Sequence, residues 1–396
     1  MAKIISVNAG SSSLKFQLFE MPQETVLTSG IVERIGLSEG IFTIKVNGEK
    51  ITKTLEIKDH NVGVKLLLEA LIDYKIVESL DEIKGTGHRV VQGGSYFDKS
   101  VIATEDVVEK VDSLCSLAPL HNFAHLIGLR AFKKVLPNAT HVFVFDTAFH
   151  QTMEPEIFLY PIPYDYYTEH KVRKYGAHGT SHKYVAYRCA ELMNKNIEDV
   201  NIITCHLGNG ASLSAVKGGK CVNTSMGFTP LGGIMMGTRS GDLDPAVIGY
   251  LSEQLHVTGS EVVTMMNKRS GMLGISGISS DARDIDDAVQ AGNERAILTR
   301  KMYANRIANF IGAYVMQLRR VDAIVFTAGL GENDTAVRLE VINEVKDALN
   351  IVLDEKLNAA SRGKEIKLST DESAIEVWVV PTNEELCIAR DTYNLM

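Results

Sequence analysis

The segment from residue 173 to residue 182 combines two cationic residues, two histidines and two glycines in a turn that leads into a predicted helix. Backbone N–H groups, an imidazole and positive charge that meet at one point can hold a group that becomes more negative as it reacts. Arg89 and Arg239 each lie among glycines and small residues, in segments 87–91 and 237–241. Together the three segments predict phosphoryl transfer to a small anionic substrate.

Two polar turns, one in each half of the chain, join apolar segments that we predict to be strands. The first turn offers Asn8, Ser11, Ser13 and Lys15, and the second offers His206, Asn209 and Gly210. Facing turns of this kind can grip a polyphosphate with N–H groups and hydroxyls. Either turn alone is also typical of an ordinary β-hairpin, so the prediction depends on the pair. A P-loop kinase and a simple dinucleotide enzyme are disfavoured, because neither of their glycine patterns is present in the sequence.

A run of small residues follows the apolar strand predicted at residues 323–326. The lack of side chains at Ala328, Gly329 and Gly331 would let a flat ligand such as adenine or ribose approach the backbone closely. The structural alternative is a turn between this strand and a helix, with Asn333 as the N-cap.

Further polar residues could complete a site for an anion and a metal. Arg89 and Arg239 suit bidentate recognition of a carboxylate or phosphate, because their neighbours are small rather than acidic. Asp146 follows a buried strand, where polar residues often point into a ligand crevice, although it could instead cap the next turn. Asn8 and Glu384 offer hard oxygen donors that suit Mg²⁺ bound through water, although Glu384 could also cap the last helix.

Length and composition limit the class of protein. A chain of 396 residues with 45% hydrophobic and 23% charged residues predicts a globular protein of two domains. The net charge of −8 and the absence of a dense Lys/Arg block disfavour nucleic acid and anionic membranes as partners. No apolar run suits a signal peptide or a membrane span, and the five cysteines form no Cys-x-x-Cys. We therefore expect a cytoplasmic protein with reduced thiols.

Hydrophobic periodicity predicts a mixed α/β order in both halves of the chain. The predicted strands are residues 4–7, 16–19, 26–32, 41–46, 51–57, 141–145, 201–205, 211–216, 323–326 and 376–380. The predicted helices are residues 62–74, 104–114, 122–135, 181–193, about 293–318 and 383–395. An apolar stripe on the long helix, which we expect to pack in the core, consists of Tyr303, Ile307, Phe310, Ile311, Tyr314 and Leu318.

The strand–turn–strand unit that occurs once in each half suggests an internal duplication. We expect a first domain at residues 1–150 that includes the C-terminal helix 383–396, and a second domain at residues 151–382. No Pro- or Ser-rich linker separates the halves, so the two domains are expected to share a tight cleft.

With these residues in view, the chain resembles the acetate kinase family from end to end. The matching segments are residues 7–15, 87–91, 117–122, 145–150, 175–182, 206–210, 224–230, 237–245, 271–277, 326–333 and 381–386. The resemblance implies two domains with duplicated ribonuclease H-like cores around a central cleft, as in the sugar kinase, actin and heat-shock chaperone superfamily. It also implies a homodimer that catalyses reversible, Mg²⁺-dependent transfer of the ATP γ-phosphoryl group to acetate, giving acetyl phosphate and ADP by direct in-line transfer.

The resemblance also assigns roles to residues. Asn8 and Glu384 would hold Mg²⁺, with Mn²⁺ as an alternative ion. The expected contacts to ATP or ADP are Ser11, Ser13, Lys15, His206, Leu207, Gly208, Asn209, Gly210, Asp281, Ala282, Arg283, Gly329, Leu330, Gly331, Glu332 and Asn333. The expected acetate contacts are Arg89, Val91, Leu120, Ala177 and Pro230.

For catalysis, the family implies that Arg89 binds the carboxylate or the transferring phosphoryl group, and that His178 and Arg239 stabilise the transition state. Asp146 occupies the family's acid/base position. A carboxylate is already a competent nucleophile, so catalysis consists of positioning and of neutralising charge on the phosphoryl oxygens. We therefore expect Asp146 to orient Arg89 or Arg239 rather than to remove a proton.

The chain departs from the family pattern at several positions. Ala177 stands where the family has Phe, Phe123 replaces a Pro, Gln92 and Ser95 replace a His and a Glu, and Gly232 replaces a Glu. A void beside Ala177 would favour a longer acid such as propionate, because each buried methylene is worth about 1 kcal/mol. Alternatively, Phe123 or another side chain fills the gap and acetate stays preferred.

Three other functions remain open at this point. A propionate or other short-chain acyl kinase would use the same residues. An actin-type ATPase switch would share the phosphate turns, but it would have no reason to place Arg89, Arg239 and His178 around a small carboxylate. A sugar kinase would use Asp146 to activate a hydroxyl, but two arginines argue against a neutral substrate.

Overall fold

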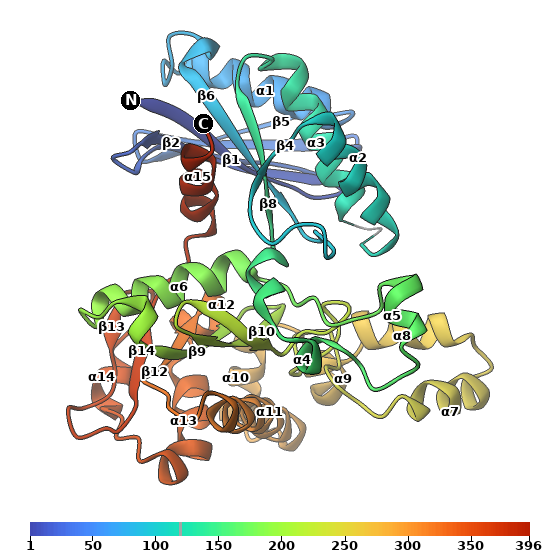
Figure 1. Cartoon of the computed structure of the whole chain (residues 1–396), viewed down its shortest axis with the longest axis vertical. Helices are drawn as coiled ribbons and strands as arrows, with labels where there is room; N and C mark the ends of the chain where they lie inside the picture. Colours follow the sequence, from blue (N-terminus) through green and yellow to red (C-terminus); the bar gives the residue numbers. More distant parts are fainter. Residues whose placement is uncertain (119–120) are drawn as a thin grey trace. The chain divides into compact units, whose positions relative to one another are not determined.

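The computed structural model describes residues 1–118 and 121–396, so the expected acetate contact Leu120 lies outside the described residues. The chain forms two compact units (Figure 1). The first unit comprises Met1–Gln151 and Asn383–Met396, and the second comprises Thr152–Thr382. In the part of the chain that is described, no helix is both long and apolar enough to cross a membrane.

The first unit is built on an eight-stranded mixed sheet with the order β5-β4-β3-β2-β1-β6-β8-β7. Its strands are β1 (Ala2–Ala9), β2 (Ser13–Met21), β3 (Thr25–Glu33), β4 (Gly40–Val46), β5 (Glu49–Leu55), β6 (Ile83–Val90), β7 (Val101–Ile102) and β8 (Thr140–Phe145). Its helices are α1 (His60–Asp73), α2 (Glu105–Ser113), α3 (Asn122–Val135) and α15 (Glu384–Asn394).

Alternation along β8 shows that helices cover both faces of this sheet. Val142 and Val144 pack against Ile388 of α15, whereas Phe143 and Phe145 belong to the apolar cluster that includes α3. Successive side chains of a strand point to opposite faces, so α15 and α3 lie on opposite sides of the sheet. Burial on both faces also explains why β8 is a continuous apolar run rather than an alternating one.

The second unit contains a six-stranded sheet with the order β11-β10-β9-β12-β14-β13. Its strands are β9 (Asn201–Leu207), β10 (Ala211–Lys217), β11 (Lys220–Thr224), β12 (Ala323–Thr327), β13 (Ile366–Lys367) and β14 (Glu376–Val379). Its helices are α4 (Pro155–Phe158), α5 (Asp165–His170), α6 (Gly179–Leu192), α7 (Ala246–Leu255), α8 (Gly259–Lys268), α9 (Gly271–Ser276), α10 (Ala282–Gln290), α11 (Glu294–Leu318), α12 (Ala328–Asn333), α13 (Thr335–Leu349) and α14 (Glu355–Ala359).

The two sheets repeat one topology. In the first, β1 pairs antiparallel with β2, which pairs antiparallel with β3, while β1, β6 and β8 run parallel and β7 closes the edge antiparallel. In the second, β9, β10, β11, β12, β14 and β13 take the same places with the same directions. This match confirms the predicted α/β class and the internal duplication.

One helix of each unit follows the last long strand of the other unit's sheet. The chain leaves β8 of the first unit and forms α6, which packs on β9 and β12 of the second. It leaves β14 of the second unit and forms α15, which packs on β1 and β6 of the first. Gly85 and Gly87 of β6 face α15 so closely that any side chain there would collide with Ile388 or Thr392.

Most predicted elements occur within a few residues of their expected ends. The stripe on α11 is confirmed as core, because Tyr303, Ile307, Ile311, Tyr314 and Leu318 are buried. The structural alternative for the segment after β12 is wrong: residues 328–333 form the short helix α12, and Asp334 rather than Asn333 caps the following helix by accepting from the N–H groups of Ala336 and Val337.

Candidate functional site

The first unit brings together polar residues from the carboxyl ends of three neighbouring parallel strands. Asn8 lies near the end of β1, Arg89 near the end of β6, and Asp146 directly after β8. The strands are adjacent and parallel, so these ends meet at one edge of the sheet. The apolar strands thus hold three polar side chains in fixed positions.

Arg89 is held by two partners at this edge. Its Nε and Nη2 donate to Oδ1 and Oδ2 of Asp146 at 3.0 and 2.5 Å, and its Nη1 donates to Oδ1 of Asn8 at 3.2 Å. The Asp146 side chain is only 3% exposed, while that of Arg89 is 21% exposed. Asp146 therefore fixes the plane of the guanidinium, and Arg89 retains an accessible surface.

Burial and charge act in opposite directions on this pair. Burial raises the pKa of the Asp146 carboxyl, and the positive charge of Arg89 opposes that change. Burial disfavours the charged guanidinium, but the negative charges of Asp146 and Glu384 outweigh it and raise the pKa of Arg89. Burial, with a smaller contribution from Arg89, lowers the pKa of the nearby His125 to about 3, so that ring is neutral at physiological pH.

The loop after β6 is tied to α3 through hydrogen bonds. The Gln92 N–H donates to Asn122 Oδ1 at 3.1 Å, and Asn122 Nδ2 donates back to the Gln92 carbonyl at 2.8 Å. The Gln92 side chain accepts from the Gly94 N–H at 2.9 Å, so it has a structural task in the loop. Val91 is buried beside it at 9% exposure, whereas the Phe123 side chain is 58% exposed.

The polar turn after β1 is closed from within and anchored from outside. The Gly10 N–H donates to the Ser13 carbonyl at 2.8 Å, and His60 Nε2 at the start of α1 lies 2.8 Å from the Gly10 carbonyl. Ser11 is exposed and Ser13 half-buried. Lys15, which is exposed, forms an ion pair with Glu385.

The oxygen donors Asn8 and Glu384 lie around Arg89. Asn8 Oδ1 accepts from Arg89, and burial raises the pKa of the Glu384 carboxyl while Arg89 opposes that change. Glu384 is the first residue of α15, whose N-cap is Asn383. Within residues 1–118 and 121–396, no cluster of three or more His, Cys, Asp or Glu residues could bind a metal by itself. The donors present fit Mg²⁺ held through water, with substrate oxygens completing the shell.

The second unit gathers histidines at the start of α6. His178 has a φ of 58° and is the N-cap of that helix, and its ring stacks on His206 of β9 with centroids 4.2 Å apart. His178 Nδ1 lies 2.8 Å from Ser212 Oγ, and His206 Nδ1 lies 2.8 Å from Ser181 Oγ. Left-handed backbone at a non-glycine residue is uncommon and tends to occur at functional sites.

The turn between β9 and β10 meets these rings. A methyl group added to Gly210 would lie 3.5 Å from His178 Nε2 and 3.4 Å from Arg239 Nη1. The imidazole and the guanidinium therefore both flank this glycine. Arg239 also donates from Nη1 to the Pro230 carbonyl at 3.2 Å, and burial lowers its pKa. Asn209 lies against Gly237, where any side chain would displace it. Three segments remote in sequence thus converge.

A cavity of about 720 Å³ in the second unit contains many of the expected nucleotide contacts. It is lined by Asp281, Ala282, Arg283, Asp286, Val289, Gln290, Arg300, Gly329, Leu330, Asn333, Asp334, Thr335, Ala336, Glu340 and Arg362. The size suits a small ligand, and the backbone of Gly329 is open to it because no atom lies within 4 Å of where a side chain would begin.

Gly331 and Glu332, which come from the same segment as Gly329, do not line this cavity. Gly331 is buried against the backbone of Phe326 and Cys205. The Glu332 carboxylate accepts from the N–H groups of Ala328 at 2.8 Å and Thr382 at 3.1 Å, so it shapes the start of α12.

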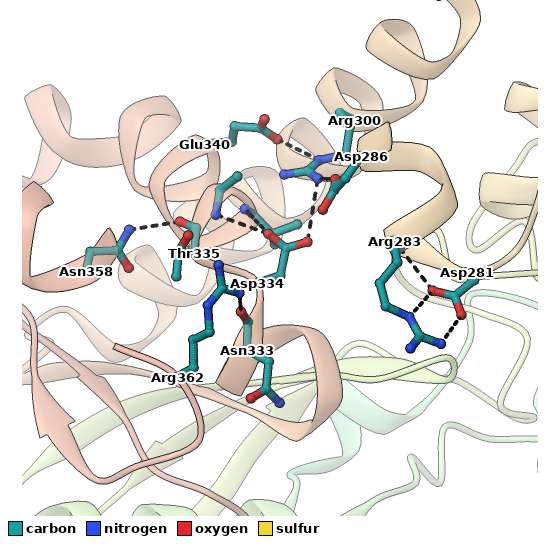
Figure 2. A network of polar contacts seen from close by, with 12 residues as sticks. Asp281, Arg283, Asp286, Arg300, Asn333, Asp334, Thr335, Glu340, Asn358 and Arg362 are labelled. Atoms are coloured by element: carbon teal, nitrogen blue, oxygen red, sulfur yellow. Dashed lines mark hydrogen bonds and ion pairs between the residues drawn. The ribbon is translucent and has the colours of Figure 1, made fainter. Parts of the chain in front are cut away.

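Sequence reasoning missed the ion cluster that forms one wall of the cavity. Arg300, with 5% of its side chain exposed, pairs with Asp286, with Asp334 at 3.5 Å and with Glu340 at 3.1 Å (Figure 2). The cluster joins α10, α11 and the cap of α13. A signal was available, because Arg300 lies three residues before Tyr303 and so in phase with the apolar stripe of α11.

Sequence reasoning also missed Arg338, which holds the end of the helix α12. It is fully buried, and it donates to the carbonyls of Gly331, Glu332, Asn358 and Ser361 at 2.6–3.2 Å. The last carbonyls of a helix carry partial negative charge, and a cation beside them interacts favourably with the helix dipole. Arg338 therefore stabilises α12. Burial lowers its pKa to about 10.

The two departures from the family pattern in the second unit, Ala177 and Gly232, lie in packed surroundings. Ala177 is 4% exposed and belongs to the main apolar cluster of this unit. A side chain on Gly232 would begin 3.3 Å from the Asp242 carboxylate. The nearest polar group to the position of the family's glutamate is therefore Asp242.

Comparison with known proteins covers the whole chain. Residues 3–390 match the model of the Acetokinase family. An acetate kinase of Macrococcus caseolyticus is 56% identical over 392 residues, which cover 99% of this chain and 98% of that protein. The structure of Porphyromonas gingivalis acetate kinase has a TM-score of 0.96 at 44% identity, and that of a Francisella tularensis propionate kinase has 0.94 at 40%, each covering 100% of both chains.

Proposed function

Because this chain belongs to the acetokinase family, we propose how its own residues carry out the reversible transfer of the ATP γ-phosphoryl group to acetate. Its reaction is that of an acetate kinase, a phosphotransferase with a carboxyl group as acceptor. A carboxylate needs no deprotonation at neutral pH, so the protein has to bind two anions in line and neutralise the charge that develops between them.

Arg89 would hold the acceptor anion. The observation that carries this proposal is the fork of two hydrogen bonds from Arg89 to a nearly inaccessible Asp146. A buried carboxylate engaged on both oxygens is suited to orient a cation and poorly suited to collect a proton from a substrate. The exposed part of Arg89 is then preset for an incoming carboxylate or phosphoryl oxygen.

The donor nucleotide would lie on the second unit. Its base and ribose would enter the cavity beside Gly329 and Asp281, and its phosphates would follow the turn at Gly210. His178 and Arg239 flank that glycine and would donate to the transferring oxygens, where preorganised donors are worth the most.

Asn8 and Glu384 would hold Mg²⁺ through water when the nucleotide is bound. The ion supplies positive charge to the phosphate oxygens and thereby lowers the repulsion between the two anionic substrates. Around it, Arg89 keeps Asn8 in place through its 3.2 Å hydrogen bond, and the rigid start of α15 holds Glu384.

A homodimer is part of the proposal. Large apolar side chains are exposed on the second unit, among them Tyr164 at 62%, Tyr250 at 63% and Ile162 at 48%. Side chains of this size are enriched where proteins associate. Sedimentation equilibrium should give twice the mass of the 43.5 kDa chain, and a monomer at micromolar concentration would refute the dimer.

The direct test is a hydroxylamine trap with Mg-ATP and acetate, propionate or butyrate in separate reactions. We expect acyl hydroxamate from acetate above the other acids, and a loss of product when Mg²⁺ is chelated. A clear preference for propionate would favour the short-chain alternative that Ala177 raised. ATP hydrolysis without hydroxamate from any acid would refute the acyl kinase.

A further inference from the structure

Hydroxyl groups link two histidines of the second unit into one chain. His178 Nδ1 and His182 Nε2 each lie 2.8 Å from the Oγ of Ser212. His182 Nδ1 lies 2.7 Å from Thr204 Oγ1, and Thr204 donates its hydroxyl proton to the Ser214 carbonyl at 3.4 Å. Ser212, His182 and Thr204 are all 0% exposed, so bulk water has no access to these links.

The protons in this chain can point in only two self-consistent directions, because each hydroxyl has a single proton. The Thr204 hydroxyl is placed to donate to the Ser214 carbonyl, and in that direction its oxygen accepts from His182 Nδ1–H at 2.7 Å. His182 Nε2 is then the acceptor for the Ser212 hydroxyl, and Ser212 in turn accepts from His178 Nδ1–H. In this direction the proton of a neutral His178 lies on Nδ1.

At the stacked ring of His206, the hydrogen bond to Nδ1 has the opposite direction. Thr382 donates its hydroxyl proton to Ser181 Oγ at 2.8 Å. Ser181 then has its own proton to donate to His206 Nδ1, 2.8 Å away. A neutral His206 therefore carries its proton on Nε2 and can donate from that atom. Two rings whose centroids are 4.2 Å apart thus differ in what their Nε2 atoms offer.

We propose that Thr204 is a positioning residue which, through His182 and Ser212, makes His178 a donor at Nε2 only in its doubly protonated form. The inference rests on the proposed function, in which His178 Nε2 meets a phosphoryl oxygen beside Gly210. Among the described residues, the titratable and charged groups near the ring include His182 on α6, His206 on β9 and Arg239 across Gly210.

This direction couples the charge of His178 to the substrate. Arg239 repels a proton on the ring, whereas an anion bound between the two groups favours it. His178 would therefore gain its second proton as the phosphate arrives and donate a charge-assisted hydrogen bond, which is stronger than a neutral one. His206 can donate from Nε2 whether its ring is neutral or doubly protonated, so it does not depend on that step.

The first experiment reads the tautomer directly. In protein labelled with ¹⁵N-histidine, long-range ¹H–¹⁵N correlation distinguishes protonated from bare ring nitrogens, and the His178 signals are identified by their loss in His178→Gln. We expect Nδ1–H for neutral His178 in the substrate-free enzyme. Thr204→Val keeps the shape but removes the hydroxyl, so His182 takes the Nε2–H form, the chain reverses and neutral His178 shows Nε2–H.

The second experiment measures kcat against pH at saturating substrates. In the wild type and in the matched control Thr204→Ser, kcat should fall on the alkaline side, by about tenfold per pH unit, as His178 loses its second proton. In Thr204→Val, kcat should be several-fold lower near neutral pH but should lose this alkaline fall, because the neutral ring can now donate. Thr204→Ala serves the same purpose if the valine variant does not fold.

An Nε2–H signal for neutral His178 in the wild type would overturn the inference, as would identical tautomers in the wild type and Thr204→Val. An alkaline fall of the same slope in both would also overturn it. The tautomer measurement needs no turnover. A failure of the proposed function would instead appear as absence of hydroxamate in the wild type, so the two failures are distinguishable.

Discussion

Asp146→Asn tests whether the buried carboxylate orients Arg89 or removes a proton. The amide has nearly the same size and shape, but its NH2 group cannot accept a hydrogen bond. The variant therefore keeps one of the two bonds from Arg89, at 3.0 or 2.5 Å, and loses the other. The bond from Arg89 to Asn8 at 3.2 Å is retained, so the guanidinium turns about that contact instead of leaving the site.

The size of the effect follows from the bond that is lost. A hydrogen bond to a charged group contributes about 1.5–3 kcal/mol, which corresponds to roughly a 10- to 150-fold loss in kcat/KM for acetate. Because Arg89 would contact the acceptor, the loss should fall mainly on the KM for acetate, and the KM for ATP should change little. Arg89→Lys keeps the charge without the fork, so it should cause a similar loss.

The assay is initial-rate hydroxamate formation from pH 6 to pH 9, with the melting temperature of each variant as a control for folding. If Asp146 acts through Arg89, the double variant Asp146→Asn/Arg89→Lys should be hardly worse than either single variant. Additive losses, or a change below about threefold in Asp146→Asn, would refute the orienting role. Disappearance of an acidic limb from kcat in Asp146→Asn would establish proton removal instead.

Three further outcomes are expected. Burial holds the pKa of His88 well below its usual value and lowers that of His125 to about 3, so the unfolded chain binds protons near pH 6.5 that the folded chain refuses. Their stabilisation is complete above pH 6.5 and is lost as the pH falls, by about 1.4 kcal/mol per histidine and pH unit. The free energy of unfolding measured by urea titration should therefore drop by roughly 3 kcal/mol between pH 7 and pH 5.5, and a flat profile would contradict this. Arg300→Met leaves three carboxylates of the cavity wall without their cation, so the KM for ATP should rise at least tenfold while the KM for acetate stays unchanged; equal changes in both would show a general loss of structure. Ala177→Phe should lower the ratio of kcat/KM for propionate to that for acetate by about fivefold, about 1 kcal/mol for one methylene, and an unchanged ratio in a variant of wild-type melting temperature would exclude this position from the acid pocket.

The parts of the fold that sequence periodicity determines could be predicted from the chain alone. Strands such as β8 and β12 are short apolar runs that end at a polar residue, and the stripe on α11 has a helical period. Candidate site residues that directly follow such strands, like Asp146, could be predicted for the same reason. A strand predicts where its last residue lies, because neighbouring parallel strands end together.

Contacts made across the fold could not be predicted in this way. The glycines of α12 favour a loop by intrinsic propensity, but Glu332 holds the first N–H of that helix and Arg338 holds its last carbonyls. Arg338 and Arg300 are single polar residues inside long helices, and no local spacing relates them to their partners. Only the assembled core shows that each also contacts oxygen atoms far away in sequence, as Arg338 does at Ser361 and Arg300 at Asp334.

The helix α15 belongs to the first unit but is the last element of the chain, and this has a consequence for how the protein is synthesised. The helix covers one face of the first unit's sheet, but all of residues 152–382 are synthesised between that sheet and its cover. At translation rates of 5–20 residues per second, Val142 and Val144 wait on the order of 10–50 s for Ile388 to emerge from the ribosome. The nascent first unit therefore completes its core only after the second unit has left the tunnel, with an apolar sheet face open to chaperones in the interval.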